Sequence, residues 1–347
     1  MQDSRQGAQV QPTVVVFDPL FYLDWVYDIE EERLAARGVR LVVAQDRDEA
    51  MAALPIADIV IVHDGPFGAA EMEHLRPDVS GLVCYSVGMN QVVLPDAAAR
   101  GIPVRNLPSW ASEAVSDHTI SLLLAAHRRA VEFDTATRGK DWDVRRLLAK
   151  SGIRQYRGQL LGVIGAGRIG KLVARKARGI GFRTIATDPF IETTGDPDLP
   201  LVSLEDLLGQ SDAVAVCCSL NETSEQLLNA RTFAQMKRGM TLVNCARGGI
   251  IDEPALAAAL QDGTVLVAGL DVRAKEPPDP ATDILARLPN TVLTPHVAFY
   301  SAEGLIKYHE ECAAVTLEML EKSGRIGAGS LGESPRATGS PGVGAQA

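Results

Sequence analysis

Two series of short apolar runs, separated by helical patterns, constrain the fold of this chain more than any other feature. The longer series lies at 160–165, 183–188, 213–218, 241–246, 265–272 and 291–295. Continuous apolar runs of this length are typical of strands that are buried on both faces, as in parallel sheets. Strands that alternate with helices form a doubly wound sheet, which binds ligands beyond the carboxyl ends of its strands. The six runs therefore indicate where chemistry is expected.

The shorter series begins near the N-terminus, with runs at 13–18, 40–44, 58–63 and 81–86. These runs predict a smaller α/β unit. A long amphipathic helix is expected over 112–129, with basic residues in its last turn, where the helix dipole favours cations. A chain of 347 residues exceeds one ordinary core. We therefore expect two domains.

Two helices of the longer series have recognisable ends. Ser203 is typical of a helix start, and we expect Gly209 to end that helix. Asp252 and Pro254 predict the start of another helix, and Gly263 predicts its end. These signals separate the strands of the predicted sheet.

The ends of the chain differ from its middle. The first stretch, 1–12, is interpreted as a flexible lead-in, and 323–347 is rich in Gly, Ser, Ala and Pro. Such a composition cannot bury enough apolar surface to offset the entropy of ordering, so we expect a disordered tail.

Charge and cysteine content exclude several classes of function. The formal net charge is -10, whereas a general affinity for nucleic acid or anionic membranes needs a basic face. The chain has no run of ~18 apolar residues and no secretion signal at its start, so we expect a cytoplasmic protein without a membrane partner. The five cysteines lack a CxxC pair or a zinc spacing. We interpret them as buried core residues and expect no metal site.

The run GAGRIG, 165–170, joins the end of a predicted strand to the start of a predicted helix. In the GxGxxG arrangement, Gly165 permits a tight turn, Gly167 lets a pyrophosphate approach the backbone, and Gly170 lets helix and strand pack closely. Alone the pattern is weak, and a structural turn is the alternative. Here the next strand ends in Asp188, where a carboxylate would hold the adenosine ribose hydroxyls. The order of strand, glycines, helix and acid predicts a dinucleotide site.

Asp188 also bears on the choice between the two nicotinamide dinucleotides. A carboxylate repels a 2′-phosphate, and neither Pro189 nor Phe190 supplies a cation to bind one. The sequence therefore favours NAD over NADP as cofactor.

Three polar residues follow the carboxyl ends of predicted strands. Arg247 lies just past one strand, beside glycines that allow a sharp turn, and suits a guanidinium that grips a substrate carboxylate. Glu276 and His296 follow two further strands. Each alone could be a solvated or structural residue, but all three emerge from one edge of the predicted nucleotide-binding sheet. Together they predict an active site.

The motifs GAGRIG, NCARGGIIDE, DVRAKEPPDP and TPHVAFYS, in this order, resemble those of the D-isomer-specific 2-hydroxyacid dehydrogenases. The similarity covers about 13–322. Within the family, the run SLNETSEQLLN and the end HVAFYS are most similar to the C-terminal-binding-protein branch. Dimerisation through the 112–129 helix and its neighbours is implied by the same resemblance. The Ala, Arg and Gly richness of the chain favours a bacterial source.

The resemblance implies a catalytic set and a domain plan. Arg247, Glu276 and His296 match the Arg, Glu and His of the family. His296 would donate a proton to the carbonyl oxygen of a 2-oxo acid during its reduction, and Glu276 would stabilise the imidazolium and raise its pKa, which favours reduction at lower pH. The plan is a flavodoxin-like substrate domain at 13–106 and 298–322, into which a Rossmann NAD domain, 107–297, is inserted. Cofactor contacts are expected from Gly165, Gly167, Arg168, Ile169, Gly170, Asp188, Asn244 and Asp271.

The expected substrate contacts include departures from the family pattern. In CYSVGMNQV, 84–92, Cys84 replaces a frequent arginine, and only Gly88 keeps the family residue. We expect Val87 and Gly88 to contribute backbone N–H groups, with Arg247 and Phe299 completing the substrate site. A ring at Phe299 would narrow the pocket or favour an apolar substrate tail, and packing between domains is the equal alternative.

Other functions remain open on the sequence alone. An NAD(H)-sensing scaffold of the C-terminal-binding-protein type would have the same fold and cofactor. The altered 84–92 loop also allows a phosphono or phosphate-bearing hydroxy acid as substrate. His63 could face the cleft but is interpreted as structural, and Trp110 and Trp142 could serve a dimer surface or a core. The leading hypothesis is an NAD-dependent oxidoreductase acting on a small anionic 2-oxo or 2-hydroxy acid.

Overall fold

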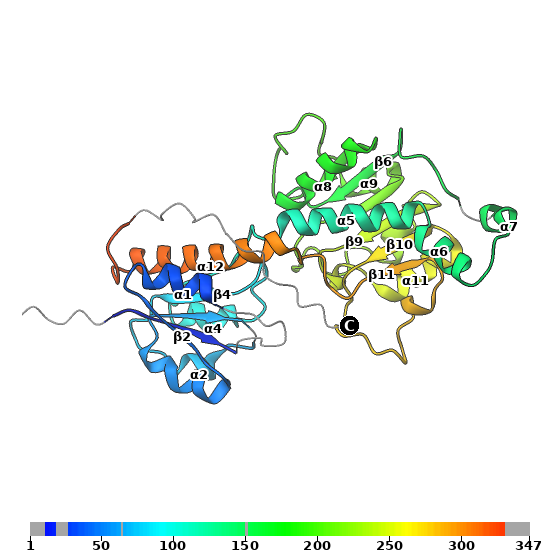
Figure 1. Ribbon diagram of the computed structural model, residues 1–347. Coiled ribbons are helices and arrows are strands. Elements are labelled where there is room, and N and C mark those ends of the chain that lie inside the picture. Colours follow the sequence, from blue (N-terminus) through cyan, green and yellow to red (C-terminus); the bar gives the residue numbers. More distant parts are fainter. Residues whose placement is uncertain (1–10, 19–26, 64, 150–151, 330–347) are drawn as a thin grey trace, which may run out of the picture. The chain divides into compact units, whose positions relative to one another are not determined.

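The computed structural model describes residues 11–18, 27–63, 65–149 and 152–329 (Figure 1). The predicted flexible lead-in and disordered tail fall mostly outside this range. The chain forms two compact units, one of Met1–Pro108 with Lys307–Ala347 and one of Ser109–Ile306. Our expected boundaries lay after 106 and after 297. The second division instead falls inside the last helix, which runs from one unit into the other.

The first unit is built on a five-stranded sheet in which all neighbouring strands are parallel, with the order β2-β1-β3-β4-β5. Its strands are β1 (Thr13–Phe17), β2 (Arg40–Val43), β3 (Ile59–Val62), β4 (Gly81–Cys84) and β5 (Val104–Arg105). The order is that of a flavodoxin-like sheet. The sequence did not predict β5, because its two half-buried residues form no apolar run.

Helices cover both faces of this sheet, since β1, β3 and β4 are buried along their whole length. In Figure 1, α1 and α12 lie on one face and α2 on the other. The helices of the unit are α1 (Asp28–Ala35), α2 (Arg47–Ala53), α3 (Ala69–Met72), α4 (Leu94–Ala99) and α12 (Ala302–Lys322), with a 3-10 turn η2 (Leu54–Ile56). Burial of both faces explains why these strands are apolar without alternation.

The second unit has a six-stranded parallel sheet of order β11-β10-β9-β8-β6-β7. Its strands are β6 (Leu160–Ile164), β7 (Arg183–Thr187), β8 (Ala213–Val216), β9 (Met240–Asn244), β10 (Val265–Leu270) and β11 (Thr291–Leu293). The order reverses between β6 and β8, which is the switch point where ligands bind on such sheets. The predicted doubly wound α/β fold is confirmed.

Two apolar layers enclose this sheet. One packs α5 and α8 against one face, and the other packs α9, α10 and α11 against the opposite face. The helices of the unit are α5 (Ser112–His127), α6 (Ala130–Arg138), α7 (Val144–Ala149), α8 (Arg168–Gly179), α9 (Leu204–Gln210), α10 (Ala230–Phe233) and α11 (Glu253–Asp262), with 3-10 turns η3 (Gly248–Ile250) and η4 (Leu285–Arg287). The predicted helix over 112–129 corresponds to α5, which ends at His127, so Arg128 and Arg129 lie beyond its last turn.

The helix signals in the sequence were correct with one exception. Ser203 caps α9 by accepting a hydrogen bond from a backbone N–H, and Asp252 caps α11 in the same way. Gly263 ends α11 with a φ of +80°. The prediction that Gly209 ends α9 is wrong, because the N–H of Ser211 still bonds to the carbonyl of Leu207 and the helix continues through the glycine. A glycine marks a helix end only where the backbone turns left-handed.

Candidate active site

The glycine loop after β6 has close approaches that only glycine permits. Gly165 has a φ of +96°, and a Cβ there would lie 2.6 Å from the backbone nitrogen of Cys218. A Cβ on Gly170 would lie 2.0 Å from the carbonyl oxygen of Gly165, so helix α8 packs directly on the turn. Around Gly167, by contrast, there is open space. An open backbone at the first turn of a helix suits the approach of a phosphate.

Asp188 follows β7 beside this loop. Its Oδ2 accepts a hydrogen bond from the N–H of Ala166 at 2.9 Å, and its Oδ1 accepts one from the N–H of Phe190 at 3.0 Å. A cavity of about 650 Å³ lies here, lined by Gly165, Gly167 and Asp188 among others. Arg168 and Ile169 are the first residues of α8. The glycine turn, the start of α8 and the carboxylate of Asp188 together fit a bound dinucleotide.

Arg247 is held by the turn that follows β9. The side chain of Asn244 braces this turn, since its Nδ2 donates to the carbonyl of Arg247 at 2.9 Å and its Oδ1 accepts from the N–H of Ala246 at 2.9 Å. The guanidinium donates to the Ala246 carbonyl at 2.7 Å. Burial lowers the pKa of Arg247, and the charge of Glu276 partly offsets this effect. Arg247 is therefore a half-buried cation near one carboxylate.

Glu276 and His296 form a direct contact, with 2.6 Å between Oε2 and Nδ1. Their side chains are 35% and 41% exposed, so both stay open to a ligand. Burial raises the pKa of Glu276, but the bonds from His296 and from the N–H of Arg273 outweigh it, and the pKa lies below its ordinary value. The carboxylate is thus charged and oriented toward the imidazole.

The backbone of His296 is in an uncommon conformation, with a φ of +54°. Asp271, at the end of β10, holds this segment in place. Its carbonyl accepts from the N–H of His296 at 2.8 Å, and its carboxylate accepts from the N–H groups of Val297 at 3.0 Å and Ala298 at 2.9 Å. Three consecutive bonds compensate for a left-handed residue that is not glycine.

The buried carboxylate of Asp271 has two further neighbours. Thr294 donates its hydroxyl to Oδ1 at 2.5 Å, and Nε2 of His118 lies 3.0 Å from that hydroxyl and 3.5 Å from Oδ1. Since the threonine proton is directed at Asp271, Nε2 of His118 carries the proton of its own contact. We had not singled out His118 or Thr294. Thr294 lies within the predicted strand 291–295, one residue before its end, which was the available signal.

One aromatic ring lies beside the histidine, and a second packs against the first. Phe299 is half-buried, with its ring centroid 6.2 Å from that of His296 at an interplanar angle of 73°. Trp110 packs against Phe299, with 5.9 Å between centroids. The second unit thus brings Arg247, Glu276, His296 and Phe299 to the carboxyl edge of its sheet, whereas Val87 and Gly88 belong to the first unit.

His63 and three of the five cysteines are buried side chains. His63 is buried, with Nδ1 2.7 Å from the hydroxyl of Tyr27, and burial lowers its pKa to about 3. The cysteines Cys84, Cys245 and Cys312 are buried as expected, whereas Cys217 and Cys218 are partly exposed. Burial raises the pKa of Cys84 to about 12, so its thiol is no nucleophile.

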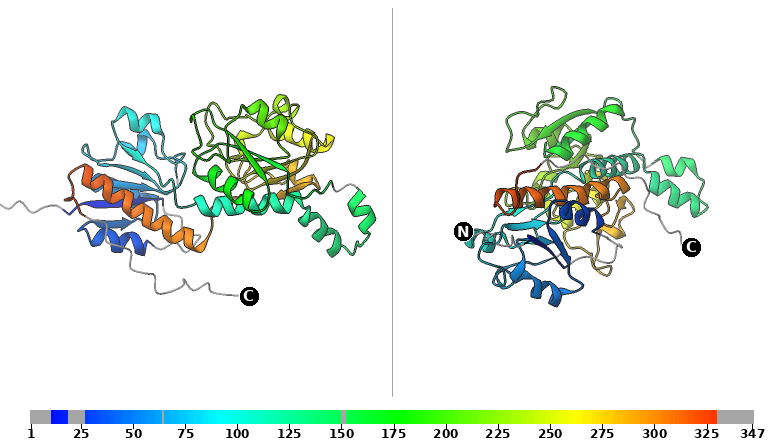
Figure 2. Two further views of the ribbon diagram at one scale, coloured as in Figure 1. Left: turned by 90° about the horizontal axis from the view of Figure 1, so that it is seen from above. Right: turned by 60° about the vertical axis from the view of Figure 1, so that its left-hand side comes forward.

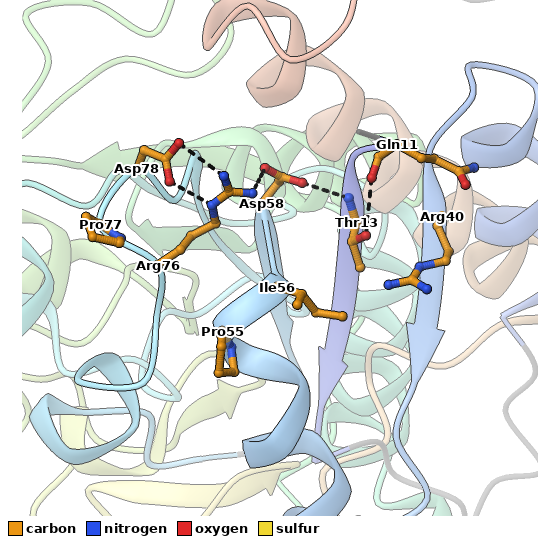
Figure 3. Close-up of a pocket in the computed structure, with 9 residues that line it drawn as sticks. All are labelled: Gln11, Thr13, Arg40, Pro55, Ile56, Asp58, Arg76, Pro77 and Asp78. Carbon is orange, nitrogen blue, oxygen red and sulfur yellow. Dashed lines mark hydrogen bonds and ion pairs between the residues drawn. The ribbon is translucent and has the colours of Figure 1, made fainter. Parts of the chain in front are cut away.

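A second cavity, of about 590 Å³, lies at the amino ends of β1, β2 and β3 (Figure 3). The carboxylate of Asp58 dominates it, and accepts from the N–H of Thr13 at 2.8 Å and from Arg76 at 2.8 Å. Arg325 lies 3.1 Å from the same carboxylate. Because parallel sheets bind ligands at the opposite, carboxyl edge, and because these charges neutralise one another, this cavity is not the predicted site.

Residues 11–18, 27–63, 65–149 and 152–329 contain no group of three potential metal-binding side chains. Within the same residues no helix is long and apolar enough to cross a membrane.

The second unit combines a glycine turn, an acidic residue after the next strand and a polar cluster at the carboxyl edge of its sheet. These features define it as a nicotinamide dinucleotide domain of a dehydrogenase. Residues 120–298 match the family described as D-isomer specific 2-hydroxyacid dehydrogenase, NAD binding domain. The chain belongs to this family, and its cofactor is NAD. The similarity to the C-terminal-binding-protein branch within it stays a prediction.

Individual relatives agree with this assignment. The chain is 34% identical to the glycerate dehydrogenase of Methylorubrum extorquens over 74% of this chain and 81% of that protein. It is 36% identical to the D-3-phosphoglycerate dehydrogenase of Mycobacterium tuberculosis over 76% of this chain, but spans only 49% of that protein. A crystal structure of a Thermus thermophilus protein is similar with a TM-score of 0.75 and 33% identity, over 89% of this chain and 97% of that one.

Proposed function

We propose that this protein is an NAD-dependent dehydrogenase that interconverts a small 2-oxo acid and its D-2-hydroxy acid. The observation that carries the proposal is the 2.6 Å contact between Glu276 and His296 at the carboxyl edge of the NAD-binding sheet. A histidine oriented by a carboxylate is the usual arrangement of a general acid and base. Bound NAD(H) accepts or supplies the hydride.

His296 would move the proton that accompanies the hydride. Its Nδ1 is engaged by Glu276, so Nε2 is the nitrogen that exchanges a proton with the substrate oxygen. In reduction the proton goes from Nε2 to the carbonyl oxygen as hydride is added to C2, and in oxidation both return. Glu276 favours the imidazolium that forms when His296 has taken up the proton.

Arg247 would bind the substrate carboxylate and polarise its carbonyl. A half-buried guanidinium with one weakly opposing carboxylate has spare donors for an anion. Asn244 keeps the guanidinium in place through the turn. The proposed contacts of Asn244 and Asp271 with NAD, like those of Gly165, Gly167, Arg168, Ile169, Gly170 and Asp188, rest on their position at this edge.

The turn after β4 supports a role for Val87 and Gly88 in holding an anion. The carbonyl of Val87 accepts from Asn106 at 2.6 Å, and that of Gly88 accepts from the hydroxyl of Ser86 at 2.7 Å. With their carbonyls fixed, the two residues can offer backbone N–H groups to a substrate carboxylate.

The position of Phe299 supports the proposal that the substrate has an apolar or aromatic tail. Its ring stands edge-on to the imidazole of His296 and is backed by Trp110, so that the wall beside the reacting carbon is a rigid apolar surface. A phosphorylated tail would need cations at this wall instead. The proposed substrate is therefore a 2-oxo acid with an apolar side chain.

We also propose that the chain assembles as a homodimer. Figure 2 shows α6 and α7 projecting from the rest of their unit. Trp142, just before α7, and Val144, the first residue of α7, are 74% and 58% exposed. Exposed apolar groups of this size commonly mark a protein interface. Sedimentation equilibrium tests this, and a monomer at all concentrations would contradict it.

The experiment for the enzyme follows NADH oxidation with a panel of apolar, aromatic and phosphorylated 2-oxo acids. We expect turnover that His296→Gln lowers by about 10² to 10⁴-fold, the contribution of a positioned general acid. The exposed His74 provides a matched control, since His74→Gln removes an imidazole from the other unit. Tight NADH binding without turnover on any acid would contradict the proposal and favour an NAD(H)-sensing scaffold.

A further inference from the structure

Arg273 follows the end of β10 and is enclosed by two carboxylates. Its Nε and Nη2 donate to Glu253 at 2.9 and 3.2 Å, and its Nη1 and Nη2 donate to Asp283 at 2.6 and 2.7 Å. The arginine side chain is only 9% exposed. Both pairs are bidentate, which is the geometry that fixes a guanidinium most tightly. Arg273 is therefore anchored between the start of α11 and the segment before η4.

The backbone of Arg273 carries this anchoring to Glu276. The N–H of Arg273 donates to Oε1 of Glu276 at 2.8 Å, while Oε2 of the same carboxylate contacts His296. The next N–H, that of Ala274, donates to Glu253 at 2.9 Å. One carboxylate oxygen thus faces the anchored loop and the other faces the imidazole. The rotamer of Glu276 depends on where this loop is held.

The same loop is packed against the turn of Arg247. A Cβ on Gly248 would lie 1.9 Å from the carbonyl carbon of Arg273, so the two backbones are in direct contact. Displacement of the loop would therefore disturb the turn that carries the guanidinium as well as Glu276. Arg273 therefore contacts both Glu276 and the turn that carries Arg247.

The ion pairs of Arg273 with Glu253 and Asp283 stabilise its position. Burial lowers the pKa of Arg273, but the bonds with Asp283 and Glu253 outweigh it and raise the pKa above the ordinary arginine value. The bond from Arg273 holds the pKa of Asp283 below its usual range. Removing the cation would leave two carboxylates of low exposure without a charged partner, which is strongly unfavourable.

We infer that Arg273 is a positioning residue that holds Glu276 against His296 through its own backbone N–H. The inference rests on the proposed function of that pair. Lysine cannot replace it, because an ammonium group lacks the planar fork that binds two carboxylates at once. Arg273 touches neither the substrate nor the cofactor in this role.

The test compares Arg273→Lys with Arg129→Lys. Arg129 is equally buried and binds Glu132 and the carbonyl of Leu266, away from the Glu276 loop. Protein containing ¹⁵N-labelled histidine reports the Nδ1 resonance of His296, which is assigned by its loss in His296→Gln. Glu276→Gln defines the shift that follows when the carboxylate contact is lost. Thermal melting and NADH affinity are measured for every variant.

In Arg273→Lys we expect the His296 resonance to move toward its position in Glu276→Gln, with NADH affinity unchanged and kcat lower by about 10²-fold, the order expected for a misplaced catalytic group. Arg129→Lys should leave both unchanged even if it melts earlier. A His296 resonance that stays in place in folded Arg273→Lys would overturn the inference. A shifted resonance in a protein whose wild type turns over no 2-oxo acid would support the positioning and contradict the proposed function.

Discussion

Each unit of this protein contains a contact between a glutamate and a histidine, and the two contacts differ in exposure. In the second unit, Glu276 lies 2.6 Å from His296, with side chains 35% and 41% exposed. In the first unit, Glu30 lies 2.9 and 3.0 Å from Nδ1 of His309, with side chains 0% and 12% exposed. The two pairs have the same chemical groups in opposite surroundings.

The carboxylate of Glu30 is fully buried. Its carboxylate also accepts the hydroxyl of Tyr85, whose ring stacks on Tyr308 with 4.1 Å between centroids. A buried charge is tolerated only when hydrogen bonds satisfy it, and here they come from α12 and from the end of β4. The pair therefore joins elements of the core.

The carboxylate of Glu276, in contrast, is partly exposed. The carboxylate is fixed by one backbone N–H and one imidazole, both on loops at the carboxyl edge of a parallel sheet. Nearby, Arg247 offers a cation to an anion. The comparison teaches that residue type does not define a site. Exposure at the correct edge of the sheet does.

The largest expected effect comes from breaking the buried pair. Glu30→Gln removes the charge but keeps the volume, and should lower the free energy of unfolding by about 3 kcal/mol, the cost of disrupting a buried ionic contact. Urea denaturation measures this loss. Turnover per folded molecule should stay at the wild-type level. A variant of normal stability with impaired turnover would reverse the comparison.

Breaking the exposed pair should have the reverse signature. Glu276→Gln should lower kcat by about 10²-fold, because His296, the proposed general acid, loses its orienting partner. The free energy of unfolding should change by less than about 1 kcal/mol, as for most exposed ion pairs. Steady-state kinetics and the same urea titration measure the two quantities. Loss of stability without loss of rate would assign the pair to the core.

The sequence predicted those parts of the fold and the site that depend on neighbours in the chain. The apolar runs predicted the strands of the described residues except β5, and Ser203 and Asp252 predicted two helix starts. The order of Gly165 to Asp188 predicted the NAD cofactor. The error at Gly209 has the same origin, since a glycine signals a helix end only through a conformation that the sequence does not reveal.

Contacts between distant segments could not be predicted. Glu30 and His309 are 279 residues apart, and nothing in either local pattern points to the other. The sequence did not single out Arg273, because its two carboxylate partners come from α11 and from the segment before η4. Its position just after a strand end was the only available signal. The proposed roles of these residues depend on how deeply they are buried. Burial follows from the tertiary fold and cannot be read from the local sequence.

The smallest expected effect is a pH dependence of stability that arises from His63. Burial is the main reason that the folded-state pKa is about 3, with the charge of His309 as a lesser cause, whereas the ordinary value is 6.5. Between these values the unfolded chain binds one more proton at this position than the folded chain. Stability should therefore fall with decreasing pH, by about 1.4 kcal/mol for each pH unit below the ordinary value.

Urea titrations of the wild type and His63→Asn between neutral and mildly acidic pH isolate this contribution. Other groups titrate in both proteins, so only the difference between the two free energies of unfolding is informative. That difference should shrink as the pH falls, because the asparagine variant lacks the proton uptake on unfolding. A difference that is constant over this range would mean that His63 takes up a proton without unfolding. Burial would then not keep this histidine neutral in the folded protein.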